Sequence, residues 1–473
     1  MVFQRIFPLF VLLILAGACT SENNPPQTAA AAQAGAPAMP REIEKEVGPA
    51  YASPALQVMV NRVGQKLVSR SGLSGSYRFY VLDQPIANAH AMSSGYVFVT
   101  RGLLALMDDE AELAAAMGHE LGHIVQKHAA QREQARKGVL DSAVDAALKS
   151  GSMSVGRSVA REGLLQLRRY SRDQELEADR VGLGYITRAG YRGDAMITLI
   201  EKLRRQARLE DELMGETGGT AETGDRSALS THPAPDDRLV ALRGVVAAST
   251  PGDSDRPEYL RSIDGMSVDD APEEGFVRGS TFLHPTMQLA FALPRDFRLF
   301  NDHDGVIGVG RDRSMMYFSC KRERVPGRLD DWMRNQLKPT PTDIQETEIG
   351  GAEAAIGARP RGSDTGLGQI RYVIIRHDEG ICYFNLLADG PDKDRRIETM
   401  VAATRSFRHL SMAEAAAVRP YRLQIVPTAG TSPAALAARL PYSDSRMERL
   451  LTLNGVDDGA ALMRRPEAKT VGP

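Results

Sequence analysis

Three histidines and a glutamate lie close together in the stretch MGHELGHIVQKH, residues 117–128. His119 and His123 are four residues apart, so on a helix they share one face and can direct two imidazole nitrogens at one metal ion. Glu120 lies beside them, where its carboxylate can reach a metal-bound water. The pattern predicts half of a catalytic metal site that activates water. A solvated helix face is the alternative interpretation.

A catalytic site of this kind needs a third protein ligand and an open position for water. The solution in which a third histidine follows six residues after His123 is excluded, because the chain has Gln126 and Ala129 where that pattern needs glycine and histidine. His128 lies five residues after His123 and points off the ligand face of a continuous helix. We therefore predict that His128 is a surface residue.

A carboxylate from a second helix is the other solution, and the stretch YSRDQELEADRVG, residues 170–182, offers one. Glu175 and Asp179 share a helix face at a spacing of four, while Glu177 points away. One of the two carboxylates can bind the ion, and the other can hold a ligand histidine through its far ring nitrogen. On its own this segment is an ordinary charged helix, so it indicates a metal site only in combination with the two histidines.

The elements that must position these groups lie within residues 41–250. Apolar residues recur at helical spacing in four segments: 53–72, 108–137, 157–188 and 194–214. YRFYVLD and GYVFVTRG, between the first two segments, predict short strands. The Gly- and Thr-rich stretch 215–231 predicts a mobile loop. We expect a multidomain α+β protein in which residues 41–250 form a mainly helical domain with a small sheet.

Strand patterns dominate residues 275–412 and predict a separate mixed α+β domain, joined through a linker at 251–274 and followed by a small module at 420–473. Cys320 and Cys382 lie in strand-like runs of the second domain. A disulfide and two buried free thiols are equally open there. No role is assigned to four histidines that lack ligand spacing: His284, His303, His377 and His409.

The first nineteen residues predict export, because Arg5 precedes an apolar run that is short for a membrane span. Ala-Gly-Ala before Cys19 favours a lipid-anchored lipoprotein over a soluble secreted form. Residues 20–40, rich in Pro, Ala and Gln, predict a flexible tether. The net charge of -2 gives no bulk attraction for nucleic acid, so no such partner is expected. The expected location is the bacterial periplasm, anchored to the outer membrane.

Three motifs in order, HELGH, SRDQELEAD and THPAPDDR, closely resemble the zinc metallopeptidase family that includes the CaaX prenyl proteases and the bacterial periplasmic outer-membrane assembly proteases. The resemblance covers roughly residues 42–248. It implies that His119, His123 and Glu175 bind one zinc ion per chain. Glu120 is then the general base for peptide hydrolysis, and Asp179 orients a zinc-bound histidine.

The resemblance also places His232 and Arg238, from the third motif, at the active site. In membrane-embedded relatives such residues face the substrate carbonyl, whereas in some periplasmic relatives the histidine takes the fourth zinc position and holds the enzyme latent; both roles stay open. Ala87–Ala91 matches the edge strand that pairs with the substrate backbone, with Asn88 as the expected polar contact. Residues 93–95 are Ser-Ser-Gly where the family often has Pro-Gly-Gly.

The later segments resemble accessory domains. Residues 275–412 resemble PsbP-like domains attached to some exported members of the family, and residues 420–473 resemble a LysM-type module, which implies contact with peptidoglycan; a simple packing appendage is the alternative. The expected function is an exported zinc endopeptidase that acts on cell-envelope proteins in quality control. The competing hypothesis is a non-catalytic chaperone or cell-wall adaptor that retains a latent metal site.

Overall fold

The computed structural model describes the chain in several ranges: 38–150, 152–214, 232, 236–246, 252–302, 305–310, 312, 314–322, 324–360, 368–378 and 380–473. The predicted signal peptide, nearly all of the tether, the 215–231 loop and His303 lie outside them. The chain divides into two compact units. Among the described residues, one unit is Ala271–Arg419, and the other combines those from 38 to 270 with Pro420–Pro473. None of the helices in the described ranges has the length and apolar content needed to cross a bilayer.

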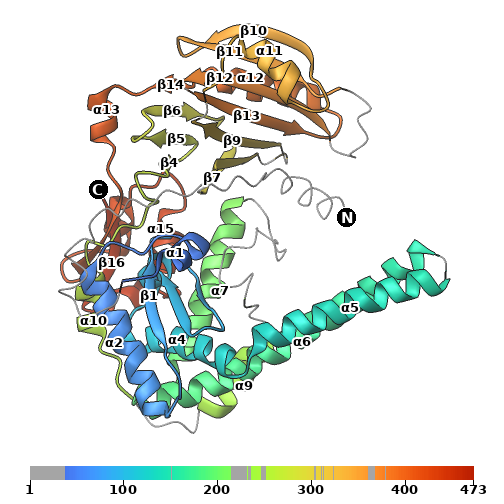
Figure 1. Ribbon diagram of the computed structural model, residues 1–473. Coiled ribbons are helices and arrows are strands. Elements are labelled where there is room, and N and C mark those ends of the chain that lie inside the picture. Colours follow the sequence, from blue (N-terminus) through green and yellow to red (C-terminus); the bar gives the residue numbers. More distant parts are fainter. Residues whose placement is uncertain are drawn as a thin grey trace. The chain divides into compact units, whose positions relative to one another are not determined.

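The unit that contains the histidine motif is mainly helical (Figure 1). Its helices are α1 (Arg41–Val47), α2 (Pro54–Ser71), α3 (Arg101–Leu106), α4 (Glu110–Val125), α5 (His128–Ser150), α6 (Met153–Arg188), α7 (Ala195–Met214), α9 (Asp236–Val246), α10 (Arg256–Ile263), α14 (Pro433–Arg439), α15 (Arg446–Leu453) and α16 (Gly459–Met463). Its strands are β1 (Arg78–Leu82), β2 (Ala89–Ala91), β3 (Tyr96–Thr100), β15 (Arg422–Pro427) and β16 (Glu467–Gly472). The predicted helical domain with a small sheet is confirmed.

The small sheet has the order β1-β3-β2, with β1 parallel and β2 antiparallel to β3. Strand β1 packs on α2 through Phe79, whose ring lies where a Cβ on Gly64 would stand. The alternating apolar residues of β1 and β3 bury one face of the sheet against α2 and α4. This core fixes β2 at one edge of the sheet, beside α4.

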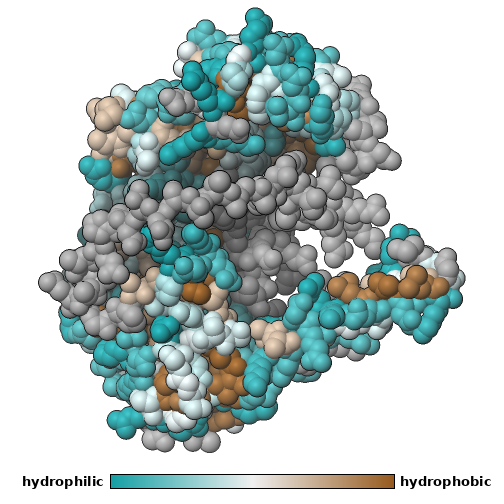
Figure 2. Space-filling view, in the orientation of Figure 1, coloured by the Kyte–Doolittle hydropathy of each residue, from teal (hydrophilic) through white to brown (hydrophobic). Residues whose placement is uncertain are grey.

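Helix α6 has two parts with different partners. Its first part forms a long hairpin with α5, which projects from the rest of the unit (Figure 1), and its second part packs on α4. Figure 2 shows apolar residues gathered along the outer part of this hairpin, where Leu140, Val144 and Leu148 are 51%, 59% and 76% exposed. The spacing of four places them on one face of α5. The carboxylates of interest lie in the other part of α6.

The C-terminal residues complete the first unit. Strands β15 and β16 pair antiparallel, and the amide of Val268 donates to the carbonyl oxygen of Tyr421 at 2.9 Å. Helix α10 buries Tyr259, Leu260 and Ile263 in the same core as Leu423 of β15. The segment 251–274, which we expected to be a linker, therefore holds a core helix, and residues 420–473 pack as part of the unit rather than as a separate module.

Lys469 of β16 ties this segment to the start of α4. Its Nζ is fully buried and donates to the carbonyl oxygens at the end of α3, those of Ala105, Leu106 and Met107, at 2.8–2.9 Å. It also lies 3.0 Å from Oδ1 of Asp108, two residues before α4. Burial lowers the pKa of Lys469 to about 8, although Asp108 opposes that shift. The ammonium thus supplies donors to acceptors that water does not reach.

Replacing this lysine should destabilise the unit that contains the histidine motif. Lys469→Met leaves three buried carbonyl oxygens without their donor and is expected to lower the free energy of unfolding by about 3 kcal/mol or more. Urea unfolding followed through the helical circular dichroism signal measures the change. Lys45→Met, at an exposed lysine of α1, is the matched control. Equal stability of the two variants would contradict the expected role.

The second unit is a mixed α+β fold, as predicted. Its strands are β4 (Phe276–Arg278), β5 (Thr281–His284), β6 (Leu289–Ala292), β7 (Phe297–Asp302), β8 (Gly305–Gly310), β9 (Met315–Lys321), β10 (Thr342–Ile349), β11 (Ala352–Ala358), β12 (Gln369–His377), β13 (Gly380–Ala388) and β14 (Arg408–His409). Its helices are α11 (Leu329–Gln336), α12 (Lys393–Thr404) and α13 (Met412–Ala417). The larger sheet has the order β10-β11-β12-β13-β9-β8-β7, and β14-β6-β5-β4 form the smaller one.

Alternation along the central strands buries both faces of the larger sheet. Val373 packs in the cluster that contains Ile397 of α12, whereas Ile374 packs with Met333 of α11. Cys320 and Cys382 stand directly opposite each other on β9 and β13 and form a disulfide. The structure therefore contains the disulfide and not two buried free thiols.

Candidate metal centre

The contact between α4 and α6 depends on small residues. A Cβ on Gly122 would lie 2.9 Å from the carbonyl oxygen of Ala178, and a Cβ on Gly182 would lie 2.9 Å from the carbonyl carbon of Gly118. Larger side chains at these positions would push the helices apart. The close approach brings the HELGH segment of α4 beside the carboxylates of α6, although the two motifs are far apart in the sequence.

Four side chains direct nitrogen or oxygen atoms at a common point: His119, His123, Glu175 and His232. Their ligand atoms all lie within 4.8 Å of one another. Nε2 of His119 is 3.0 Å from Nε2 of His123 and 3.2 Å from Oε2 of Glu175. Nδ1 of His232 is 3.3 Å from Nε2 of His119 and 3.1 Å from Oε2 of Glu175.

The separations of these atoms suit a tetrahedral zinc ion. Imidazole nitrogens and carboxylate oxygens bind zinc at about 2.0–2.1 Å, so neighbouring ligands of a tetrahedral site lie about 3.3–3.4 Å apart. In five of the six pairs among these side chains the donor atoms are 3.0–3.4 Å apart, and all of them lie within 4.8 Å of one another. His119, His123 and Glu175 are also buried, which limits competition from water. The residues present therefore fit a zinc ion.

Asp179 and Arg238 hold the first histidine. Oδ1 of Asp179 lies 2.9 Å from Nδ1 of His119, which leaves Nε2 of that ring facing the common point. Arg238 donates from Nε and Nη2 to the two oxygens of Asp179, both at 2.7 Å. Burial would lower the pKa of His119, but the hydrogen bonds to Asp179 and Glu175 outweigh it and raise the pKa to about 10. The predicted orienting position of Asp179 matches this geometry.

Removing the Asp179 carboxylate should weaken metal binding without removing a ligand. Asp179→Ala is expected to lower zinc affinity about 10–100-fold, because the ring of His119 loses the group that fixes its orientation and basicity. Competition with a zinc-binding dye measures the affinity. Asp173→Ala, at an exposed carboxylate of the same helix, is the control. The same loss of affinity in both variants would contradict this role.

Glu120 lies beside the metal-ligand group without belonging to it. It is 3% exposed, and its Oε1 is 3.4 Å from Nε2 of His232. Burial raises the pKa of a carboxyl group, but the neighbouring His232, His123 and His119 outweigh it and lower the pKa of Glu120. The carboxylate is therefore ionised and able to accept a proton, as the predicted base requires.

His232 and Arg238 come to the centre in different ways. Nδ1 of His232 is within the group of converging donors. Arg238 is buried behind Asp179, donates from Nη1 to the carbonyl oxygen of His232 at 3.3 Å, and lies 3.4 Å from Oε2 of Glu175. Of the two open alternatives for His232, this placement favours the fourth metal position over contact with a substrate carbonyl.

The prediction that His128 is a surface residue is wrong. Helix α4 ends at Val125, Lys127 adopts a φ of 57°, and α5 begins at His128. The chain reversal buries His128 completely and places its Nδ1 2.8 Å from Nδ1 of His123. Nε2 of His128 lies 3.3 Å from Oε2 of Glu177, which was expected to point away from the site. His128 therefore orients His123 as Asp179 orients His119.

Strand β2 lies at an edge of the small sheet, as expected for residues 87–91. β2 ends the sheet order, and Asn88 and Met92 on either side of it form hydrogen bonds toward β3, through Thr100 and Tyr96. In an antiparallel pair such bonds alternate along the strand, so the main-chain groups of Ala89 and Ala91 face the open edge. The main chain of Asn88 is engaged within the sheet, and only its side chain can make the substrate contact that we expected.

His90 is a residue of this region to which we assigned no role from the sequence. It lies on β2, and its ring stacks on Phe98 at 4.9 Å between centroids. Burial lowers its pKa, while the charge of Glu120 raises it and that of His232 lowers it further. Its strand packs on α4, the helix that carries His119 and His123. A sequence signal for this placement was available, because His90 lies in the run NAHAM, residues 88–92, which overlaps the expected edge strand.

Two helices that present a histidine pair and a glutamate around one point, with a buried ionised carboxylate next to the first histidine, define a domain of the metallopeptidase class. A model of peptidase family M48 matches residues 54–246. The chain carries a peptidase family M48 domain, and the family resemblance of the three motifs is confirmed.

Named relatives agree with this assignment. The beta-barrel assembly-enhancing protease of Escherichia coli (strain K12) is 29% identical over 208 residues, 41% of this chain and 40% of that protein. Mitochondrial metalloendopeptidase OMA1 of Schizosaccharomyces pombe is 30% identical over 42% of this chain and 56% of its own length. Metalloprotease LoiP of Escherichia coli (strain K12) is 29% identical over 41% of this chain and 70% of its own. The chain thus spans less than two thirds of the first two relatives.

Proposed function

We propose that this protein is an exported zinc-dependent endopeptidase that hydrolyses proteins of the cell envelope as part of their quality control. The observation that carries the proposal is the convergence of His119, His123 and Glu175 on one point with the ionised Glu120 beside them. Relatives named as a beta-barrel assembly-enhancing protease and as metalloproteases support a proteolytic role and an envelope setting.

His119, His123 and Glu175 are the proposed zinc ligands. When bound, zinc supplies a Lewis acid that polarises a peptide carbonyl and lowers the pKa of a bound water toward ~7. Manganese and cobalt accept the same nitrogen and oxygen donors, so metal analysis of the purified protein is part of the test. His119→Ala should reduce the bound metal, because it removes one ligand.

The catalytic work of the chain falls to a few residues. Glu120 takes a proton from the attacking water and delivers it to the leaving amine. Asp179 and His128 keep the two ligand rings in place. The outward main-chain groups of Ala89 and Ala91 pair with an extended substrate at the sheet edge, and the side chain of Asn88 is the proposed polar contact.

His232 is proposed to hold the enzyme latent. A catalytic zinc site keeps one position open for water, whereas the four donors of this site form a closed set. The observation in support is the place of His232 Nδ1, 3.1 Å from Glu175 and 3.3 Å from His119. Release of His232 would open that position, and Arg238, which donates to its carbonyl oxygen, helps to retain it.

The proposed location is the periplasm, with a lipid on Cys19 anchoring the chain to the outer membrane. The apolar run before Ala-Gly-Ala-Cys supports this location. A LysM-like role for residues 420–473, with contact to peptidoglycan, is supported by the strand–helices–strand order from β15 to β16. For residues 275–412 we propose a PsbP-like accessory domain.

Digestion of casein tests the function. We expect the purified protein to cleave casein once His232 has left the fourth metal position. A chelator that removes the metal should abolish this activity, and added zinc should restore it. The competing hypothesis of a chaperone or adaptor predicts no metal-dependent cleavage. Residual cleavage that is equal with and without chelator would reject the proposal.

A further inference from the structure

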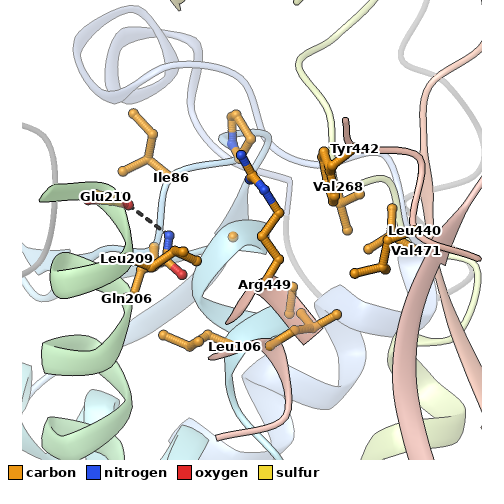
Figure 3. A pocket seen from close by; sticks show the side chains of 15 residues that line it. Ile86, Leu106, Gln206, Leu209, Glu210, Val268, Leu440, Tyr442, Arg449 and Val471 are labelled. Carbon is orange, nitrogen blue, oxygen red and sulfur yellow. Dashed lines mark hydrogen bonds between the residues drawn. The ribbon is translucent and has the colours of Figure 1, made fainter. Parts of the chain in front are cut away.

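A cavity of about 260 Å³ lies in the unit that contains the metal centre, on the side where the C-terminal residues pack. Figure 3 shows Ile86 and the α7 residues Gln206 and Leu209 on one side of it, and Leu440 and Val471 on the other. Most of its walls are apolar side chains. An apolar cavity of about 150 Å³ is large enough to hold benzene, so this one has room for a bulky apolar side chain.

The cavity adjoins the start of the edge strand. Pro85, Ile86 and Ala87, directly before β2, form part of its wall. Strand β2 packs against α4, the helix that carries Glu120, and His90 of β2 is four residues after Ile86. Four residues span at most about 13 Å in an extended chain. A peptide that pairs with β2 near Glu120 therefore reaches the cavity within a few residues.

Arg449 of α15 gives the cavity one fixed polar group. In Figure 3 its side chain extends through the middle of the cavity, toward Tyr442 and Ile86. Its guanidinium lies over the ring of Tyr442 at 4.5 Å, and its Nε and Nη2 donate to Asp444. These contacts fix the guanidinium while Nη1 makes no hydrogen bond to any described residue. A donor is thus available beside an apolar wall.

We propose that this cavity is a specificity subsite for the polypeptide substrate, formed jointly by the M48 domain and the C-terminal residues. It takes one bulky apolar side chain of a segment that pairs with β2, and Arg449 Nη1 donates to a main-chain carbonyl of that segment. The inference rests on the proposed function, and it names the substrate class as extended chains with an exposed apolar residue a few positions from the cleaved bond.

Peptide binding to the full-length Glu120→Gln protein with zinc tests the subsite without cleavage. The probes are two fluorescein-labelled 16-residue peptides of alternating Thr and Ser, identical except that one carries a single central Phe. Fluorescence anisotropy should show about tenfold or tighter binding of the Phe peptide, from burial of its side chain. Gln206→Trp, which fills the cavity, should remove that preference, and Arg449→Ala should weaken binding of both peptides.

Arg208→Trp, at an exposed residue of the same helix, is the matched control and should keep the preference. Equal affinity for the two peptides, no saturable binding, or a preference that survives Gln206→Trp would overturn the subsite. If the protein cleaves casein but its preference for the Phe peptide is the same with and without Gln206→Trp, only this inference is overturned. A cavity-dependent preference in a protein that cleaves nothing would instead count against the proposed function alone.

Discussion

Glu120→Gln is expected to lower casein hydrolysis roughly 10³-fold, the loss typical of a missing general base. Glutamine has nearly the same shape but cannot accept a proton from water. Because Glu120 does not belong to the group of converging donors, the variant should keep its metal. The initial rate of casein cleavage and the zinc content per chain measure the two effects.

The combination of these two measurements separates the role of Glu120 from loss of the site. His119→Ala, which removes a proposed ligand, should lose both activity and zinc, whereas Glu120→Gln should lose activity alone. A Glu120→Gln variant that cleaves casein at the rate of the unaltered protein would exclude this carboxylate as the base.

His232→Ala is expected to raise basal casein cleavage roughly tenfold or more, because an active form that is rarely populated becomes the main one. The physical reason is the position of His232 Nδ1, 3.1 Å from the Glu175 carboxylate, where it completes a closed set of four donors. Zinc affinity should fall at the same time, since one donor is lost. Cleavage rate and zinc affinity are both measured on the same preparation.

The opposite result has a specific meaning. Loss of cleavage in His232→Ala, with zinc retained, would assign His232 to stabilisation of the oxyanion instead of latency. His409→Ala, at an exposed histidine of the other unit, is the control and should change neither the cleavage rate nor the zinc affinity. An unchanged rate in His232→Ala would rule out both roles.

The sequence predicted the parts of the centre that follow from helical periodicity. His119 and His123 share a face because they are four residues apart, and the same spacing joins Glu175 to Asp179. The motif resemblance singled out Glu175 as the ligand on that second helix and supplied His232. The structure brings all of these side chains together, although their catalytic and ligand roles remain predictions.

Other features depended on where helices end and on contacts distant in sequence. His128 was assigned to the surface because α4 was assumed to continue, but the turn at Lys127 sends it back to His123. Lys469 gave no local signal, since its acceptors at the end of α3 are more than 350 residues away. A periodicity read within one segment carries no information on either contact.

The hydrogen bond between Val268 and Tyr421 has a consequence for the architecture of the chain. It brings together the two points where residues 271–419 leave and rejoin the rest, so that this unit is an insertion in a single loop of its host. A short bridge could replace the insertion and leave the metal centre and the cavity whole. Cutting the chain at the same loop would instead remove Lys469 and the cavity-lining residues of the C-terminal segment, among them Leu440, Arg449 and Val471.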